Sequence, residues 1–492
     1  VAIMQKVLCV LVLTIAISNF ECFSFNVYVK SLELTHYEYI EVNLEGIESV
    51  GSKDFYMYLL RDNGIIPDLL GREKIFGRFS NGRLVFLYIP NYGIRDGVYE
   101  MCILSNSNVL FRTNLVIMSR QQLKLNEPLK VLTFEENVPI QRLFSHRRKL
   151  SYREVANEIY EIMKDAGLNT FLMLAGQTTY LKSKEIWYSV PLSNLNVLKF
   201  LKDKGIQTGA YVMCFLTLGQ NEKNRFNGYY PNLIMKNKDL VKDYKYTSIL
   251  SDTRISNLID VLEYIGKKDY VDFIGLDFIR TGDYGGYELI PDFASEILCK
   301  LDFTEKLDEK ATLKSIKNNK EINKLFKWYK AIRVSRVVKE IVSSLRNRGI
   351  NKPIIAFMLG WNAGREHGQD LFMFRDAGID YSFYMLYEFY SDEMFDKAGE
   401  YYLKFVYNLD TQIVFGNIID TKLNKGKNDP IKSFSERLKK FVTYYSYFPP
   451  NGFFFHDLYR LNFGRIKPYT KEEWMNQIRE TTYFLSEFFR NN

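Results

Sequence analysis

The sequence has little cysteine and little histidine. Its five cysteines are Cys9 and Cys22 near the N-terminus and Cys102, Cys214 and Cys299 further on, widely spaced and in apolar surroundings. A disulfide framework needs several cysteines in a small domain, and a zinc site needs closely spaced ligands. The three later cysteines fit neither and are expected to be buried thiols. The four histidines form no tight cluster with Asp or Glu of the kind that a metal site requires. We therefore predict neither a metal nor another cofactor, which disfavours a metal-dependent polysaccharide deacetylase.

Other signatures and composition biases are also absent. No G-x-S-x-G elbow, phosphate-binding loop or G-x-G-x-x-G fingerprint follows a predicted strand. Low-complexity tracts are lacking, and 47% hydrophobic and 25% charged residues are typical of ordinary globular proteins. The net charge of +8 comes from 66 basic and 58 acidic residues with both signs interleaved, and the densest basic stretch, 306–330, is typical of a solvated helix face. The charge pattern therefore predicts no nucleic-acid partner.

The N-terminal residues 1–24 contain one continuous apolar run. A single lysine precedes the apolar stretch from Val7 to Ile17, and small or polar residues follow it. This order is typical of a secretory signal peptide. The run is short for a membrane span, which needs about 20 apolar residues. The sequence therefore predicts a secreted or cell-surface protein, with an uncleaved membrane anchor as the alternative.

Two different hydrophobic rhythms divide the rest of the chain. Residues 25–120 show short runs of alternating apolar and polar residues separated by turn residues, which predicts an antiparallel, immunoglobulin-like β-sandwich. Residues 121–130 are expected to be a linker. From 131 to 492, short β-rich runs alternate with amphipathic helical stretches, which predicts parallel strands joined by crossover helices. Eight such repeats predict a (β/α)8 TIM barrel of the α/β class.

The eight barrel strands can be placed from their apolar runs. They are expected at 131–134, 170–175, 208–215, 273–279, 353–359, 381–386, 412–417 and 452–457. Helices are expected between and after them, at 151–167, 192–205, 254–268, 331–349, 391–407, 435–448 and 472–490. Long loops are expected at 216–252 and 283–325, after strands three and four. Active sites of such barrels lie at the C-terminal ends of the strands, so both loops are candidates for function.

Asp277 is the first candidate for catalysis. It ends the apolar run of strand four in "FIGLDFIR", with Arg280 three residues later. An acid at the C-terminal end of a barrel strand lies at the catalytic face, and Arg280 can bind substrate or hold the aspartate ionised. The alternative is a structural Asp that caps the strand or pairs with Arg280. The sequence favours a catalytic or substrate-contacting Asp277.

Polar and aromatic residues follow the other strands. Glu388 and Tyr387 follow strand six, and because a strand alternates sides, only one of two neighbours needs to point inward. A glycine-rich loop after strand five offers further polar residues, of which Asp370 is as well explained as a helix cap. The remaining candidates come from this loop and from strand ends one, two, four and eight: Trp361, Glu366, His367, Gln177, Asp283, His456, Asp457, Glu135 and Glu136. The residues at strand ends one, two and eight are second-rank candidates.

Four segments, in order, resemble a known family. Residues 167–187, 201–212, 249–282 and 368–387 are similar to motifs of glycoside-hydrolase-like barrels, the glycosyl-hydrolase-like 10 group and its relatives, over about residues 128–460. Asp272, Gly275, Asp277, Phe278 and Arg280 fall on the strand-four motif. The resemblance implies a barrel hydrolase that acts on carbohydrate, with Asp277 as the best catalytic match.

This chain also departs from the family pattern. Tyr211 stands where the family has a tryptophan on strand three, and Tyr384 replaces a proline before Met385. "DFIRTG" replaces the family's "DYIRYP", so we expect the segment after Arg280 to differ in its substrate contacts.

The sequence supports two functional hypotheses. The first is an exported glycoside hydrolase acting on a poly- or oligosaccharide, with Asp277 as nucleophile or base, Glu388 as acid and Glu366 as the main rival of Glu388. In this hypothesis Arg280, Trp361, His367, Asp370 and Tyr387 bind the sugar, and no cofactor takes part. The second is a non-catalytic carbohydrate-binding or cell-envelope protein on a degenerate glycosidase barrel. A second carboxyl group close to Asp277 distinguishes the hydrolase from the binding protein.

Overall fold

The computed structural model describes most of the chain after the N-terminal segment. The described residues are 25–47, 54–80, 82–125, 127–136, 138–144, 150–176, 190–216, 231–236, 239–282, 285–301, 308–359, 361–387, 393, 395–397, 411–424, 429–444 and 450–491. The predicted signal segment 1–24 and most of the predicted helix 391–407 lie outside them. No described helix is both long and apolar enough to cross a membrane.

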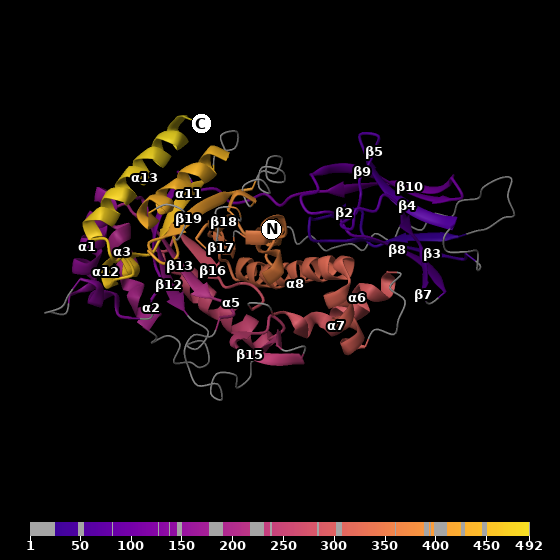
Figure 1. Ribbon diagram of the computed structural model, residues 1–492, viewed down its shortest axis with the longest axis horizontal. Coiled ribbons are helices and arrows are strands. Elements are labelled where there is room, and N and C mark those ends of the chain that lie inside the picture. Colours follow the sequence, from indigo (N-terminus) through magenta and orange to yellow (C-terminus); the bar gives the residue numbers. More distant parts are fainter. Residues whose placement is uncertain are drawn as a thin grey trace. The chain divides into compact units, whose positions relative to one another are not determined.

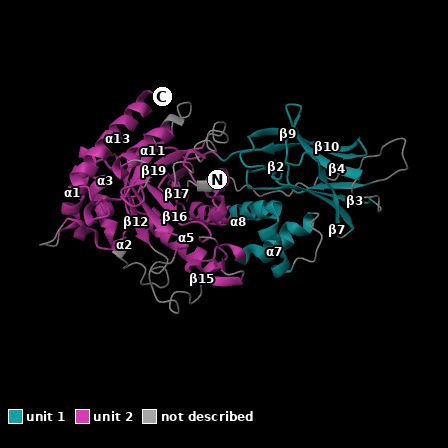
Figure 2. Cartoon of the chain, viewed as in Figure 1, with its two compact units in different colours: residues 1–120, 288–332 teal, residues 121–287, 333–492 magenta. Residues whose placement is uncertain are grey.

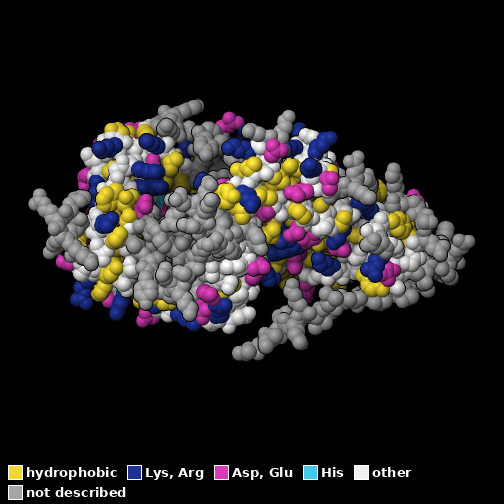
Figure 3. Space-filling model, turned by 90° about the horizontal axis from the view of Figure 1, so that it is seen from below, with side chains coloured by type: hydrophobic (Ala, Val, Ile, Leu, Met, Phe, Trp, Pro, Cys, Tyr) yellow, Lys and Arg dark blue, Asp and Glu magenta, His cyan; other side chains and the backbone are white. Residues whose placement is uncertain are grey.

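The chain forms two units (Figure 2). Unit 1 consists of the residues up to Arg120 together with Glu288–Ile332, and unit 2 consists of Gln121–Tyr287 and Arg333–Asn492. The division therefore falls inside one long helix, α8 (Lys320–Asn347). Among the described side chains on the face shown in Figure 3, both signs of charge are interspersed.

Unit 1 contains two β-sheets. One sheet has the strand order β1-β3-β8-β7; the other has the order β2-β10-β9-β4-β5, with β6 paired to β4. All pairs are antiparallel except β2 with β10. The strands span Asn26–Val29 (β1), Glu33–Leu34 (β2), Ile40–Glu45 (β3), Phe55–Arg61 (β4), Gly64–Ile65 (β5), Ile75–Phe76 (β6), Arg78–Ser80 (β7), Arg83–Tyr88 (β8), Gly97–Ser105 (β9) and Asn108–Ile117 (β10). The antiparallel β-sandwich predicted for this part of the chain is confirmed.

Alternation builds the core of unit 1. In β3, Ile40, Val42 and Leu44 are buried while the residues between them are partly exposed. The same alternation in β4 buries Met57 and Leu59, and these side chains belong to one hydrophobic cluster with those of β3. Burial of each such side chain contributes about 1.5–3 kcal/mol.

Unit 2 contains a closed barrel of eight parallel strands, which confirms the predicted (β/α)8 architecture. Its strand order is β11-β12-β13-β16-β17-β18-β19-β20. The strands span Leu129–Phe134 (β11), Thr170–Gly176 (β12), Gln207–Met213 (β13), Phe273–Asp277 (β16), Ile354–Leu359 (β17), Tyr381–Met385 (β18), Ile413–Ile418 (β19) and Gly452–His456 (β20). Each lies within a few residues of its predicted position.

Helices surround the barrel strands (Figure 1). Besides α8, unit 2 contains α1 (Tyr152–Asp165), α2 (Val190–Asn194), α3 (Asn196–Lys202), α5 (Asp252–Gly266), α9 (Leu371–Ala377), α11 (Pro430–Tyr444), α12 (Leu458–Phe463) and α13 (Lys471–Asn491), with 3-10 turns at η2 (Ile140–Leu143) and η7 (Trp361–His367). Local sequence sets their starts. Ser151, for example, forms a capping box with Glu154 at the N-terminus of α1.

Aromatic rings fill the barrel interior. The ring of Phe357 lies 5.1 Å from that of Tyr211, 5.4 Å from Phe383 and 5.6 Å from Phe454, measured between centroids. Such pairs stabilise a core beyond the area they bury. Gly416 makes room for them, since a Cβ at this position would lie 2.2 Å from the Phe454 ring. The barrel is thus a packed core rather than a channel.

The two predicted long loops contain secondary structure, so the prediction of loops was wrong there. After strand three, β14 (Pro231–Lys236) and β15 (Asp239–Thr247) form an antiparallel hairpin. After strand four come η5 (Tyr287–Leu289), α6 (Ile290–Glu296), η6 (Leu298–Lys300) and α7 (Glu309–Asn318). Their apolar side chains explain the difference, because Phe293 packs against Phe326 and Tyr329 at 5.3 Å in both cases.

The insertion after strand four packs with the sandwich inside unit 1. The Glu296 carboxylate accepts hydrogen bonds from the Tyr39 hydroxyl, at 3.2 Å, and from the Tyr329 hydroxyl, at 2.8 Å. The Lys300 ammonium pairs with Glu41 at 2.8 Å. The sequence did not indicate that this segment belongs with the sandwich.

The predicted linker 121–130 is bound to the base of the barrel. Asp380, which is fully buried, accepts hydrogen bonds from the backbone N–H groups of Leu123 and Ile354, both at 2.8 Å, and pairs with Arg346 at 3.2 Å. Its carboxylate thus joins the linker, β17 and α8. Removing one partner from a buried charged network costs about 3–5 kcal/mol.

We therefore expect Asp380→Ala to lower the free energy of unfolding by about 3–5 kcal/mol, because Arg346 and two backbone donors lose their acceptor. Asp260→Ala, which breaks an exposed pair with Arg348, is the control and should cost about 0.5 kcal/mol or less. Urea unfolding followed by circular dichroism measures both. Equal losses in the two variants would contradict the role given to Asp380.

Candidate active site

Functional side chains lie at the C-terminal ends of five barrel strands. Glu135 follows β11, Asp277 ends β16, Tyr387 follows β18, Asp420 follows β19 and His456 ends β20. Because parallel strands of a closed barrel all point the same way, these ends share one rim. This rim is where barrel enzymes build their active sites.

Asp277 is buried at this rim. Its side chain is 5% exposed, and its Oδ1 accepts a hydrogen bond from the Phe278 N–H at 2.7 Å. Phe278 has φ 48°, in the left-handed region that a bulky residue rarely adopts. Such backbone strain costs about 1–3 kcal/mol and is common at functional sites. The chain therefore holds Asp277 by a strained turn immediately after the strand.

Burial keeps the Asp277 carboxyl group protonated at neutral pH. Loss of water around the carboxyl group raises its pKa, and the nearby charge of Glu135 raises it further. Arg280, the Phe278 N–H and His456 act in the opposite direction without cancelling these effects. The pKa of Asp277 is about 8, so the side chain carries a proton at pH 7.

The pKa of Glu135 is shifted in the opposite direction to that of Asp277. Burial raises the pKa of its carboxyl group, but the interactions with His456, Arg460 and Tyr211 outweigh burial and bring the pKa below its usual value. The Tyr211 hydroxyl donates to Oε2 at 3.2 Å, and His456 Nε2 lies 3.6 Å from Oε1. Glu135 is therefore ionised at neutral pH.

His456 is fixed on both sides of its ring. Its Nδ1 lies 2.7 Å from the Thr133 hydroxyl, and the ring stacks on Tyr387 at 5.7 Å with an interplanar angle of 7°. Burial lowers the pKa of the imidazole, but the charges of Glu135 and Asp457 raise it above its usual value. The Glu135 carboxylate thus favours the protonated form of the imidazole.

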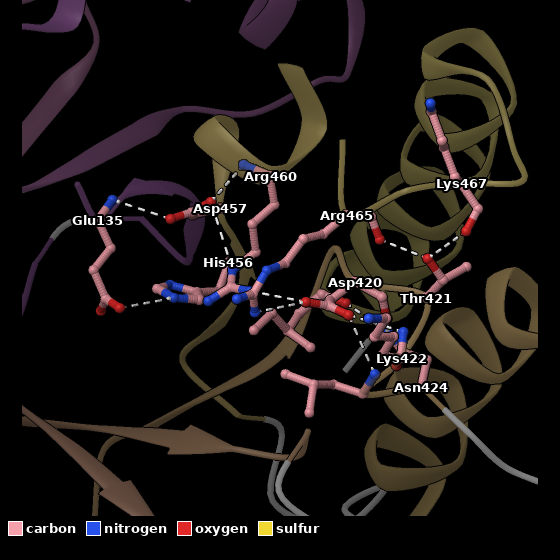
Figure 4. A network of polar contacts seen from close by, with 12 residues as sticks. Glu135, Asp420, Thr421, Lys422, Asn424, His456, Asp457, Arg460, Arg465 and Lys467 are labelled. Atoms are coloured by element: carbon pink, nitrogen blue, oxygen red, sulfur yellow. Dashed lines mark hydrogen bonds and ion pairs between the residues drawn. The ribbon is translucent and has the colours of Figure 1, made fainter. Parts of the chain in front are cut away.

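A second layer of polar residues supports this group (Figure 4). Asp457 Oδ2 accepts from the Glu135 backbone N–H at 3.2 Å, and Asp457 Oδ1 accepts from the Arg460 N–H at 2.9 Å as the N-cap of α12. The Arg460 guanidinium in turn donates to Asp420 Oδ2 at 2.8 Å, as does Arg465 at 3.3 Å. The backbone and side chain of Glu135 are thus both held in place.

The structure places the residues predicted from the sequence in different roles. Asp277, His456, Asp457 and Tyr387 come together with Glu135 at the rim. Arg280 lies with its guanidinium 4.6 Å from the Phe278 ring and lowers the pKa of Asp277. Glu388, Gln177 and Asp283 lie outside the described residues, so their roles remain predictions.

The loop after strand five shows mainly structural contacts. Asp370 is the N-cap of α9, accepting from Phe372 and Met373, and it pairs with Arg365 at 3.1 Å. His367 is 3% exposed, and its carbonyl accepts from the Thr281 N–H at 3.0 Å. Trp361 and Glu366 lie in η7. Sugar binding by this loop stays a prediction.

Sequence reasoning undervalued Glu135 and gave no role to Tyr211. A pair of glutamates directly after the first strand was the available signal for Glu135, but Asp277 and Glu388 stood in stronger motifs. The hydrogen bond of Tyr211 depends on its inward orientation from β13, which the sequence alone does not give. Within the described residues, no group of His, Cys, Asp and Glu is arranged to hold a metal ion.

Comparison with known proteins finds similarity at the level of structure. No family model matches the chain, and no curated protein matches it. A GH42 β-galactosidase from G. stearothermophilus has a TM-score of 0.50 and 11% identity over 75% of this chain and 58% of its own. A β-galactosidase from Halorubrum lacusprofundi has a TM-score of 0.46 and 10% identity, over 73% of this chain and 58% of its own. A GH36 α-galactosidase from Geobacillus stearothermophilus has a TM-score of 0.41 and 10% identity, over 95% of this chain and 68% of its own.

All three structures are glycoside hydrolases. At 11% identity, the similarity to the GH42 enzyme shows a shared fold and nothing of the activity of this chain. This chain spans 58% of the length of the GH42 enzyme. The particular barrel group that the sequence resembles is not among these findings.

The raised pKa of Asp277 predicts a cost to stability. Its folded-state pKa of about 8 exceeds the usual value of 3.8, so between these values the folded chain binds a proton that the unfolded chain has lost. The free energy of unfolding therefore falls as pH rises through this window. Asp277→Asn, which cannot ionise and keeps an acceptor for Phe278 N–H, should be more stable than the wild type.

The gain should grow from pH 5 to pH 8, and thermal unfolding at several pH values measures it. Asp260→Asn, a change at an exposed aspartate, serves as the control. A difference between Asp277→Asn and wild type that does not depend on pH would refute the raised pKa.

Proposed function

We propose that the protein is a glycoside hydrolase acting on an oligo- or polysaccharide, with Asp277 as the general acid and Glu135 as the ionised partner. The proposal is carried by two buried carboxyl groups at the barrel rim whose surroundings shift their pKa values in opposite directions, that of Asp277 upward and that of Glu135 downward. Glycoside hydrolysis uses one protonated and one ionised carboxyl group. Environments that separate two carboxyl pKa values in this way assign the acid and its partner.

Each side chain has a step in the proposed reaction. Asp277 donates its proton to the glycosidic oxygen as the bond to the leaving sugar breaks. Glu135 either attacks the anomeric carbon or removes a proton from the attacking water; a carboxyl separation of about 5 Å favours the first and about 6.5–9.5 Å the second. Tyr211 and His456 keep Glu135 ionised and oriented, and the Tyr387 ring stacks on His456.

This assignment changes the roles expected from the sequence. Asp277 was expected to be the nucleophile or base and Glu388 the acid, but a pKa of about 8 suits Asp277 to proton donation. Glu388 lies outside the described residues and remains the competing partner carboxylate. Export of the enzyme, inferred from residues 1–24, is part of the proposal.

The choice of substrate separates the two roles experimentally. Asp277→Asn should lower kcat/KM on oligosaccharides about 10²–10⁴-fold and much less on nitrophenyl glycosides, whose leaving group departs without a proton. Glu135→Gln should impair both substrate classes alike. A panel of oligosaccharides and matched nitrophenyl glycosides provides the assay, with Asp260→Asn as the active control.

Three results would redirect the proposal. Equal losses on both substrate classes in Asp277→Asn would make it the nucleophile. Full activity in Glu135→Gln together with loss in Glu388→Gln would transfer the partner role to Glu388. Glycan binding without hydrolysis by the wild type would identify the non-catalytic binding protein.

The pH dependence follows from the same pKa shifts. Activity should fall about tenfold per pH unit above about pH 8, because Asp277 then loses the proton that it must donate. On the acid side, activity should persist below the usual carboxyl range because the pKa of Glu135 is lowered. A pH profile of kcat/KM with its alkaline limb near pH 5 would contradict the assignment of Asp277 as the acid.

A further inference from the structure

Residues of the chain after strand four, among 278–282 and 285–286, contact the hairpin that follows strand three. Asn232 of β14 is fully buried, and its Oδ1 accepts a hydrogen bond from the Gly286 N–H at 2.9 Å. A Cβ added to Gly282 would lie 2.4 Å from Asn232 Nδ2, and one added to Gly285 would lie 2.0 Å from it. The chain after strand four thus wraps closely around one carboxamide, which only glycine permits at these two positions.

The hairpin itself is fixed to the barrel. Tyr246 of β15 forms a bridge with Leu216 and belongs to the hydrophobic cluster of the barrel interior. The Thr247 N–H donates to the Phe215 carbonyl at 2.8 Å. Asn232 is therefore presented from a rigid support, whereas the segment that it contacts leaves the barrel after strand four.

The hairpin also reaches the strained end of this segment. The Tyr246 ring lies 6.4 Å from that of Phe278, the residue with φ 48° that donates its N–H to Asp277. Further along, the Thr281 N–H donates to the His367 carbonyl at 3.0 Å. The segment is thus held at its start by Tyr246, in the middle by His367 and at its end by Asn232.

We propose that Asn232 is a positioning residue that fixes residues 278–282 and 285–286 and thereby keeps Asp277 buried and Arg280 in place. This inference rests on the proposed function, since it assigns a residue that serves the same site. Asn232 touches neither Asp277 nor substrate in this account. It acts through the loop, because the strained φ of Phe278 persists only while its surroundings determine it.

A merely structural Asn232 and a positioning Asn232 differ in what its removal does to Asp277. If the role is structural, Asn232→Ala lowers stability and leaves the pKa of Asp277 near 8 in the folded protein. If it positions the loop, Asn232→Ala admits water to the Asp277 carboxyl, and the pKa of Asp277 falls by about one unit or more.

The pKa of Asp277 is measured by carboxyl ¹³C NMR on protein labelled at aspartate side chains, with Asp277→Asn identifying the signal. The matched control is Asn451→Ala, which removes an equivalent bond, from Ile413 N–H to Asn451 Oδ1 at 3.0 Å, at the opposite end of the barrel. We expect a lowered pKa in Asn232→Ala and no change in Asn451→Ala. An unchanged pKa in a folded Asn232→Ala would overturn the proposal.

Gly285→Ala supplies a second variant if Asn232→Ala does not fold. Its methyl group meets the Asn232 carboxamide, so the pKa of Asp277 should fall there too. In the double variant Asn232→Ala, Gly285→Ala, the methyl group no longer meets a carboxamide, so the pKa shift should be no larger than in Asn232→Ala alone. A double variant whose shift equals the sum of the single shifts would refute the contact as the cause.

Kinetics separate this proposal from the proposed function. Asn232→Ala should lower kcat on oligosaccharides about tenfold or more and move the alkaline limb of the pH profile down with the pKa of Asp277. A shifted pKa in a protein without hydrolase activity would support positioning and refute the hydrolase. Hydrolysis that is lost in Asp277→Asn, together with a pKa of Asp277 that is unchanged in Asn232→Ala, would support the hydrolase and refute positioning.

Discussion

The burial of Asp277 next to a charged Glu135 is the interaction on which the rest of the site depends. A carboxyl group in this environment keeps its proton at neutral pH because ionisation would place two negative charges together away from water. Its neighbour stays ionised because His456, Arg460 and Tyr211 stabilise the charge. The supporting residues, from Asp457 through Arg460 to Asp420, hold this asymmetry in place rather than contacting the reacting groups.

This arrangement carries a stability cost that the fold offsets elsewhere. A buried proton-binding carboxyl group and a left-handed Phe278 both destabilise the folded chain near pH 8. The aromatic interior around Phe357 and the buried network of Asp380 contribute in the other direction. The strained backbone and the shifted pKa values lie at the rim, and the regular aromatic packing lies in the barrel interior. This is expected for a barrel whose active site is at one end of its strands.

The barrel was predictable because its signals are local. Each strand is a short apolar run, and each helix has its own period and caps, as Ser151 and Glu154 show for α1. Asp277 was predictable because it stands at the end of an apolar strand within a recognisable sequence motif. The role of Glu135 was not, because its pKa depends on His456, more than 300 residues away, and on the orientation of Tyr211. The helices after strand four were mistaken for a loop because their buried partners lie among themselves and in the sandwich.

The pairing of Asp277 with Glu135 is the central claim, and the pKa of Asp277 in Glu135→Gln tests it directly. Carboxyl ¹³C NMR of the aspartate-labelled wild type should show Asp277 protonated at pH 7 with a midpoint near 8. Glu135→Gln removes the neighbouring charge, so the midpoint should fall below that of the wild type. An Asp277 that is already ionised at pH 7 in the wild type, or a midpoint that Glu135→Gln leaves unchanged, would contradict the account.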